Sequence, residues 1–149
     1  MIRNQWYVLL ESKEVGAHPT AVIRMGERMV FWRDAAGKVC AAVDRCPHRG
    51  AALSAGVIHH EHLQCPFHGF EYDSTGKCVL IPANGRNGVI PNAMHLTTYP
   101  TYEAHGLIWI WWGQDPPAGL APPRFFEDLD QGFRWGQVID PWASHYSRV

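Results

Sequence analysis

Two short loops constrain this chain more than any other feature of its sequence. They read CPHRG at residues 46–50 and CPFHG at residues 65–69. In each loop a Pro follows the Cys and fixes the backbone there, and a closing Gly lets backbone amides approach the sulfur atom. The loops therefore present two thiolates and two imidazoles as candidate metal ligands, namely Cys46, His48, Cys65 and His68.

These four side chains match the ligand set of one kind of iron–sulfur cluster. In a Rieske-type 2Fe-2S centre, two Cys hold one iron and two His hold the other. Thiolates suit the iron that stays ferric, and neutral imidazoles suit the iron that becomes ferrous, so the mixed cluster is less negative and accepts an electron more easily. The loops supply this set with no ligand left over. We predict that Cys46, His48, Cys65 and His68 bind a 2Fe-2S cluster.

A structural zinc site is the alternative, because two Cys and two His also complete a tetrahedral zinc. Zinc fingers, however, usually pair Cys with Cys two to four residues apart, and His with His. The mixed C-x-H and C-x-x-H spacings favour iron–sulfur. A second candidate group, His59, His60 and His62, lies between the loops. We interpret it as a polar surface turn, since no carboxylate-plus-His spacing accompanies it.

The runs of β-forming residues between turn signals predict a mostly β fold in which both ligand loops hang from strand ends. The run at residues 107–112 is apolar on both faces. It predicts a strand that is buried on both sides, with part of its apolar surface packed on a partner. Proline becomes frequent after residue 114, which indicates a linker. The expected strands are residues 6–10, 21–24, 29–33, 39–43, 63–65, 107–112 and, beyond the linker, 132–139; the expected turns are 34–38 and 73–77.

The stretch CPHRGAALSAG followed by CPFHGFEYD resembles the Rieske domain of Rieske non-haem iron oxygenases. NQWYVLLESKEV near the start and YEAHGLIWIWWG at residues 102–113 resemble the vanillate demethylase-like and pheophorbide a oxygenase-like branch. The resemblance implies a Rieske-type antiparallel β-sandwich with two cluster-binding loops over residues 1–113. It also implies that residues 82–91 cover the cluster. Residues 114–149 would then be a Pro-rich linker and the start of a catalytic domain, missing from this chain, that holds a mononuclear Fe(II).

The function implied by this resemblance is electron relay in a terminal oxygenase component. The domain would accept electrons from a reductase or ferredoxin and pass them to the mononuclear iron, which activates dioxygen in a mono- or dioxygenase. The full-length oxygenase would be a homo-oligomer, a trimer, and the isolated chain would be inactive as an oxygenase. The alternative is a free-standing Rieske-type ferredoxin. Length favours the oxygenase domain, because the β core is expected to be complete by Gly113.

Charge and cysteine content restrict the partners and the compartment. The net charge is −1 at pH 7, with neither a basic stripe nor a long apolar run, which argues against nucleic-acid and membrane partners. The sequence turns polar directly after Met1, so we expect no signal peptide and a cytoplasmic location. Cys40 and Cys78 are then expected to stay reduced. Arg49, next to His48, is expected either to dock an electron donor or simply to be solvated.

Phe70 follows the HG of the second loop, where high-potential respiratory Rieske proteins have a Ser whose hydroxyl donates to a sulfide. Phe cannot donate a hydrogen bond. The resemblance therefore predicts a reduction potential near the low end of the Rieske range, roughly −150 mV.

Overall fold

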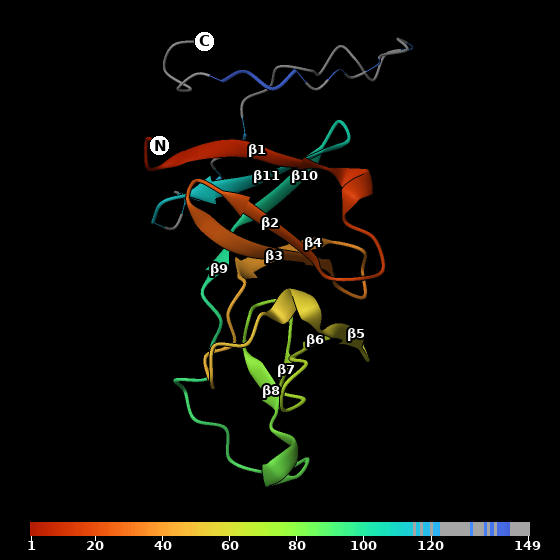
Figure 1. The fold of residues 1–149 in the computed structure, drawn as a ribbon, viewed down its shortest axis with the longest axis vertical. Helices are drawn as coiled ribbons and strands as arrows, with labels where there is room; N and C mark the ends of the chain where they lie inside the picture. The colour runs from red at the N-terminus through yellow and green to blue at the C-terminus, as the bar shows by residue number, and fades with distance from the viewer. Residues whose placement is uncertain are drawn as a thin grey trace.

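The protein was analysed as a computed structural model that describes residues 1–114, 116, 118–119, 121–122, 132, 136, 138 and 140–143. Short antiparallel strands dominate this part of the chain, as predicted (Figure 1). No helix among the described residues is long and apolar enough to cross a membrane. The strands are β1 (Gln5–Glu11), β2 (Thr20–Arg24), β3 (Glu27–Arg33), β4 (Val39–Val43), β5 (Val57–His59), β6 (His62–Gln64), β7 (Glu71–Tyr72), β8 (Cys78–Leu80), β9 (Thr98–Tyr99), β10 (Thr101–Ala104) and β11 (Leu107–Trp112), and the 3₁₀ helices are η1 (Ser12–Glu14), η2 (Leu53–Ala55) and η3 (Pro82–Asn84).

The strands form three antiparallel sheets with the orders β1-β11-β10, β2-β3-β4-β9 and β5-β6-β7-β8. In Figure 1 the first two sheets make up the upper part of the fold, and the third, with η3 at its end, forms the lower lobe. The two ligand loops start from different sheets, the first from the middle sheet and the second from the third. The first follows β4, and the second connects β6 to β7.

The middle sheet separates two hydrophobic cores, which explains why β3 and β4 are apolar at nearly every position. Met29 and Phe31 of β3 pack into the core shared with β1 and β11, whereas Val30 and Trp32 pack into the core of the lower lobe. All four side chains are fully buried. Because successive strand residues point to opposite faces, a strand buried on both sides has no polar face.

The structure confirms the predicted β-sandwich class and the longer predicted strands. It also confirms that the apolar strand at residues 107–112, β11, is buried. Trp109 and Trp111 are both buried, and Trp111 meets the ring of Trp6 edge-on at a centroid distance of 5.6 Å. Strands β5, β8, β9 and β10 were not predicted, since two to four residues are too few to show an alternating pattern. The strand predicted at 132–139 falls largely outside the described residues. The division into two domains after residue 113 stays a prediction.

Two turns of the same construction connect β3 to β4 and β7 to β8. In each, an Asp side chain accepts hydrogen bonds from the backbone amides two and four residues further on. Asp34 Oδ1 is 3.0 Å from the amide of Ala36 and 2.9 Å from that of Lys38. Asp73 Oδ1 does the same with Thr75 at 2.8 Å and Lys77 at 3.0 Å. These Asx-type bonds explain the two turns predicted at residues 34–38 and 73–77.

Each of these two turns contains a glycine with positive φ, and only one of the two glycines is packed against another segment. Alanine at the two positions therefore tests that packing. Gly37 has φ +77° and open space around it, whereas a Cβ on Gly76, at φ +84°, would stand 2.6 Å from Thr98 Cγ2 and 3.1 Å from Leu96 Cβ. We expect Gly37→Ala to cost about 1–2 kcal/mol of unfolding free energy through backbone strain alone. Gly76→Ala should cost about 1–3 kcal/mol more, because it also overpacks the contact. Thermal and urea unfolding measure both; equal losses would contradict this packing.

Candidate metal centre

The two ligand loops share one backbone construction although their His residues stand at different offsets. In the first loop the Cys46 amide donates to the Ala51 carbonyl at 2.8 Å, and the Gly50 amide donates back to the Cys46 carbonyl at 2.8 Å. In the second loop Cys65 donates to Phe70 at 2.8 Å, and Gly69 donates to Cys65 at 3.1 Å. Both closing glycines have positive φ, +73° and +69°, which favours Gly at these positions.

This construction brings the four predicted ligands together as two pairs. The Cys46 thiol lies near enough to Cys65 to raise its pKa, after burial, and each residue is only 2% exposed. The His48 and His68 rings meet edge to face with their centroids 4.6 Å apart. His48 is half-buried and His68 is exposed. The loops therefore hold the sulfur donors inside and the nitrogen donors at the surface.

The sulfur atoms are surrounded by donors that suit thiolates. The Tyr72 hydroxyl lies 3.2 Å from Cys46 Sγ, and burial, followed by the neighbouring Cys46, raises the pKa of this phenol. The phenol is therefore a donor at neutral pH. Burial raises the pKa of the Cys65 thiol, while the backbone amides of Phe67 and His68 act in the opposite direction. A lower thiol pKa favours the thiolate form that binds metals. The prediction that loop amides point at the sulfur atoms stays a prediction.

The imidazole of His48 is suited to bind a metal through one ring nitrogen. Its Nδ1 is buried and has no hydrogen-bond partner among the described residues. Burial, followed by the nearby His68 and Arg49, lowers the pKa of His48, which favours the neutral form that ligates metals. A buried, unpaired imidazole nitrogen and two buried thiols are donor types that a Rieske-type cluster requires, so the donor set fits this cofactor.

The paired arrangement bears on the zinc alternative. A single tetrahedral zinc needs all four donors around one point. The two thiols lie near each other and the two imidazole rings contact each other, an arrangement in which two irons can each take one ligand pair.

A third segment packs against the second loop. A Cβ on Gly69 would stand 3.3 Å from Pro82 Cγ, so η3 lies directly against the turn that carries His68. Ile81, just before η3, is buried in the same core as both loop cysteines. Pro82 therefore packs on the second loop, whereas the cover that residues 82–91 are expected to give the centre stays a prediction.

The first loop is also braced by a buried carboxylate that sequence reasoning missed. Asp44 is 4% exposed and accepts hydrogen bonds from the Ser54 amide at 2.7 Å, the Ser54 hydroxyl at 2.7 Å and Arg28 Nε at 2.9 Å. It therefore joins the start of the loop to the residues that follow it. The position of Asp44 directly after the apolar strand at residues 39–43 could have indicated this role. An acidic side chain that is buried at the end of such a strand needs hydrogen-bond partners.

The histidines between the loops form a surface turn, as predicted, but they also hold a carboxylate that the sequence did not reveal. Glu71 of β7 is 5% exposed. His59 Nδ1 is 2.8 Å and Gln64 Nε2 is 3.0 Å from Glu71 Oε1, and His62 Nδ1 is 3.5 Å from Glu71 Oε2. The partners come from β5 and β6, and Glu71 belongs to the adjacent β7, so this cluster depends on the sheet register and not on sequence spacing.

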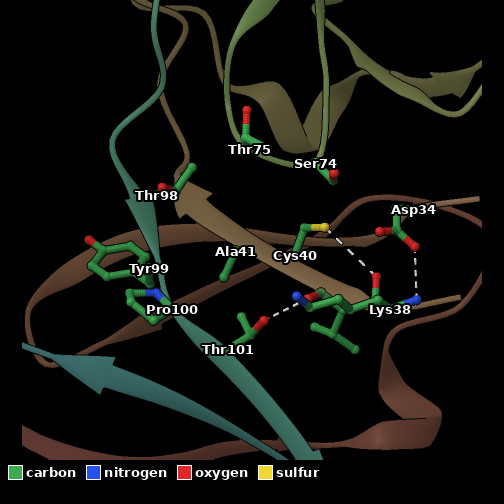
Figure 2. Close-up of a pocket in the computed structure, with 11 residues that line it drawn as sticks. Asp34, Lys38, Cys40, Ala41, Ser74, Thr75, Thr98, Tyr99, Pro100 and Thr101 are labelled. Atoms are coloured by element: carbon green, nitrogen blue, oxygen red, sulfur yellow. Dashed lines mark hydrogen bonds between the residues drawn. The ribbon is translucent and has the colours of Figure 1, made fainter. Parts of the chain in front are cut away.

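A pocket of about 240 Å³ lies away from these loops, where the turn at residues 73–77 faces β4, β9 and β10 (Figure 2). Ser74 and Thr75 line it from the lower lobe, and Cys40 and Thr101 line it from the upper part. None of the four candidate ligands lines it. Burial raises the pKa of the Cys40 thiol to about 11, so Cys40 is a poor ligand or nucleophile at neutral pH.

Comparison with known proteins agrees with this geometry. A family model described as Rieske [2Fe-2S] domain matches residues 5–100, so this chain belongs to the Rieske [2Fe-2S] domain family. The oxygenase component of dicamba O-demethylase from Stenotrophomonas maltophilia is 39% identical over 94% of this chain and 38% of its own length. The vanillate O-demethylase oxygenase subunit from Pseudomonas sp. (strain HR199 / DSM 7063) is 34% identical over 86% of this chain and 34% of its own length.

A solved structure extends the match to the fold. The crystal structure of dicamba monooxygenase with non-heme iron and dicamba superimposes with a TM-score of 0.73 at 38% identity, covering 82% of this chain and 37% of that one. The resemblance to vanillate demethylase-like oxygenases is thereby confirmed. This chain spans little more than a third of the length of these relatives.

The Glu71 cluster predicts a defined pH dependence of stability. Burial alone would raise the pKa of Glu71, but the hydrogen bonds from His59 and Gln64 outweigh burial and lower that pKa. A carboxyl with a depressed folded-state pKa stabilises the fold at pH values above its unfolded pKa, and this contribution is lost as the pH falls through the folded pKa. We expect Glu71→Gln to lose about 1.5–3 kcal/mol at pH 7.

The difference between wild type and Glu71→Gln should begin to shrink as the pH falls below about 4.3, the ordinary pKa of Glu, and should disappear below the lowered folded-state pKa of Glu71. Chemical unfolding from pH 7 to pH 3 measures it. Glu61→Gln, on the exposed side of the same turn, is the control and should change little at any pH. A Glu71→Gln penalty that persists in acid would show that the Glu71 carboxylate charge is not its source.

Proposed function

We propose that this chain is the electron-transfer domain of a Rieske oxygenase component. The observation that carries the proposal is the pair of identically closed loops, which hold two buried thiols and two imidazoles side by side. The dicamba O-demethylase match covers 94% of the chain, well past the end of the family match at residue 100. This extent supports an oxygenase component over a free-standing ferredoxin.

In this proposal Cys46 and Cys65 hold one iron of a 2Fe-2S cluster, and His48 and His68 hold the other. When bound, the cluster supplies a one-electron carrier. Tyr72 and the amides of the second loop donate hydrogen bonds to the sulfur ligands and stabilise negative charge there. The buried core around both cysteines excludes water from the sulfur side. The exposed edge of His68 is then the surface at which electrons enter and leave.

The electron donor is proposed to be a reductase or ferredoxin with an acidic docking face. Residues 45–50, 65–69 and 81–91 carry Arg45, Arg49 and Arg86 but no Asp or Glu, although the whole chain has a net charge of −1. All three arginines are exposed. Phe67 of the second loop is 60% exposed beside His68. A cationic surface with an apolar contact would steer an anionic partner toward the His68 edge.

The remaining parts of the proposal concern the whole protein. A catalytic domain outside this sequence would hold a mononuclear non-haem Fe(II), receive the electrons and activate dioxygen for a mono- or dioxygenase reaction. Residues 1–113 would be the complete electron-transfer domain, residues 114–149 the connection, and a homotrimer the assembly. Cys40 and Cys78 are buried and free, which supports a reducing compartment such as the cytoplasm.

Substitution of single ligands tests the cluster assignment. The purified chain should contain about two irons and two acid-labile sulfides and should be reddish-brown. Cys46→Ser and His68→Ala should lose the visible absorption and the iron, because each removes one ligand. Cys40→Ser, a buried cysteine outside the loops, should retain both. Stoichiometric zinc in anaerobically prepared protein would overturn the proposal.

Reversal of one charge tests the partner. Arg49→Glu should lower the second-order rate of reduction by an acidic [2Fe-2S] ferredoxin by roughly tenfold at low ionic strength, with the difference fading as salt is added. Arg24→Glu makes the same change of net charge on β2, in the upper part of the fold, and should have a much smaller effect. Stopped-flow mixing measures the rates. Equal effects of both substitutions would indicate that only net charge matters and that no docking face exists at the loops.

A further inference from the structure

Phe70 makes a contact that joins the two ligand loops. Its ring lies parallel to the ring of His48, with an interplanar angle of 6° and a centroid distance of 4.7 Å. Phe70 belongs to the second loop, whereas His48 belongs to the first. The two rings therefore form a stack between loops that are separate in sequence.

Phe70 is itself fixed on the side away from His48. It is 6% exposed and belongs to the hydrophobic core that includes Cys46, Cys65 and Tyr72. Its carbonyl accepts the hydrogen bond from the Cys65 amide that closes the second loop. Backbone and ring are thus both held, so Phe70 is a rigid surface against which another ring can rest.

His48 has few other restraints on the plane of its ring. The final torsion of a His side chain is broad, so the ring rotates unless a neighbour fixes it. Metal-binding His residues usually obtain this restraint from a hydrogen bond on the second ring nitrogen. Here neither ring nitrogen of His48 has a hydrogen-bond partner among the described residues, and the contact with His68 is edge to face. The flat face of Phe70 is therefore the contact that defines the plane.

His68 is supported differently. Its closest aromatic neighbour is Phe67, with a centroid distance of 4.0 Å and a tilt of 40°, and Phe67 is largely exposed. Phe70 is further from His68, at 6.4 Å. One candidate imidazole thus rests on the core and the other on the surface.

We propose that Phe70 is a positioning residue for His48, and that its ring holds the imidazole in the orientation in which Nδ1 can bind iron. The inference rests on the proposed function, since it concerns a ligand of the proposed cluster. It assigns to Phe70 a role beyond filling the core and beyond the missing hydroxyl donor noted in the sequence. Loss of the stack should leave the His48 ring free to turn and weaken its bond to iron.

The test compares three variants of the cluster-loaded chain. Phe70→Leu keeps an apolar side chain but removes the flat ring, and Phe70→Tyr keeps the ring. Phe31→Leu makes the same chemical change at a fully buried position in the other core, so it controls for general destabilisation. Two properties are measured: the g-values and histidine ¹⁴N couplings of the reduced protein by pulsed EPR, and the rate at which a chelator removes iron.

Phe70→Leu should change the ¹⁴N coupling of one histidine and speed iron loss by about two- to tenfold, the factor expected from losing one aromatic pair. Phe70→Tyr and Phe31→Leu should match wild type in both measurements, although Phe31→Leu unfolds at a lower temperature. Wild-type couplings in Phe70→Leu, or an equal change in Phe31→Leu, would overturn the inference while leaving the cluster assignment intact.

Two further outcomes keep the inference testable. If Phe70→Leu does not fold by circular dichroism, Phe70→Met, whose flexible side chain fills irregular space, takes its place with the same expectations. A crystal structure of the loaded wild-type chain in which His48 and Phe70 are not stacked would overturn the inference without any variant. A wild-type chain that shows no Rieske EPR signal would instead overturn the proposed function itself.

Discussion

The backbone closure shared by the two loops is the constraint on which the site depends. In each loop the Cys amide donates across the loop, and an amide from a glycine with positive φ donates back to the Cys carbonyl. This fixes both Cys side chains toward the same interior point. The His offset differs by one residue between the loops, yet both imidazoles reach the same edge. The closure sets the sulfur positions, and the remaining loop residues place the nitrogens.

The loops can be held this firmly because the cysteines are core residues. Cys46 and Cys65 pack with Trp32 of β3 and Tyr72 of β7 in the core of the lower lobe. The other face of β3 belongs to the second core, so the middle sheet is covered on both sides. A shift of β3 by one residue would exchange Phe31 for Trp32 and disturb both cores at once. The register of the scaffold and the position of the sulfur ligands are therefore linked.

The sequence was informative where function depends on local pattern and uninformative where it depends on pairing across strands. The spacing of Cys46, His48, Cys65 and His68 predicted which residues meet, since each loop folds on itself. Glu71 could not be connected to His59 and His62, because the contact arises from the register of β5, β6 and β7. Likewise, Phe70 could be compared with a Ser by position, but its stacking on His48 joins two loops whose approach no local pattern encodes.

The burial of the site is uneven, and this has a consequence for the direction of electron flow. The thiols are 2% exposed and surrounded by apolar side chains, so a partner protein cannot approach them. The His68 edge is exposed and lies beside Phe67, and Arg49 is near His48. In the proposed function, donor and acceptor would both have to use this one edge. Donor and acceptor would then bind at different times, or each would bind at a different side of the His48–His68 pair. In the second case Arg49, which is near His48, would mark one of the two sides.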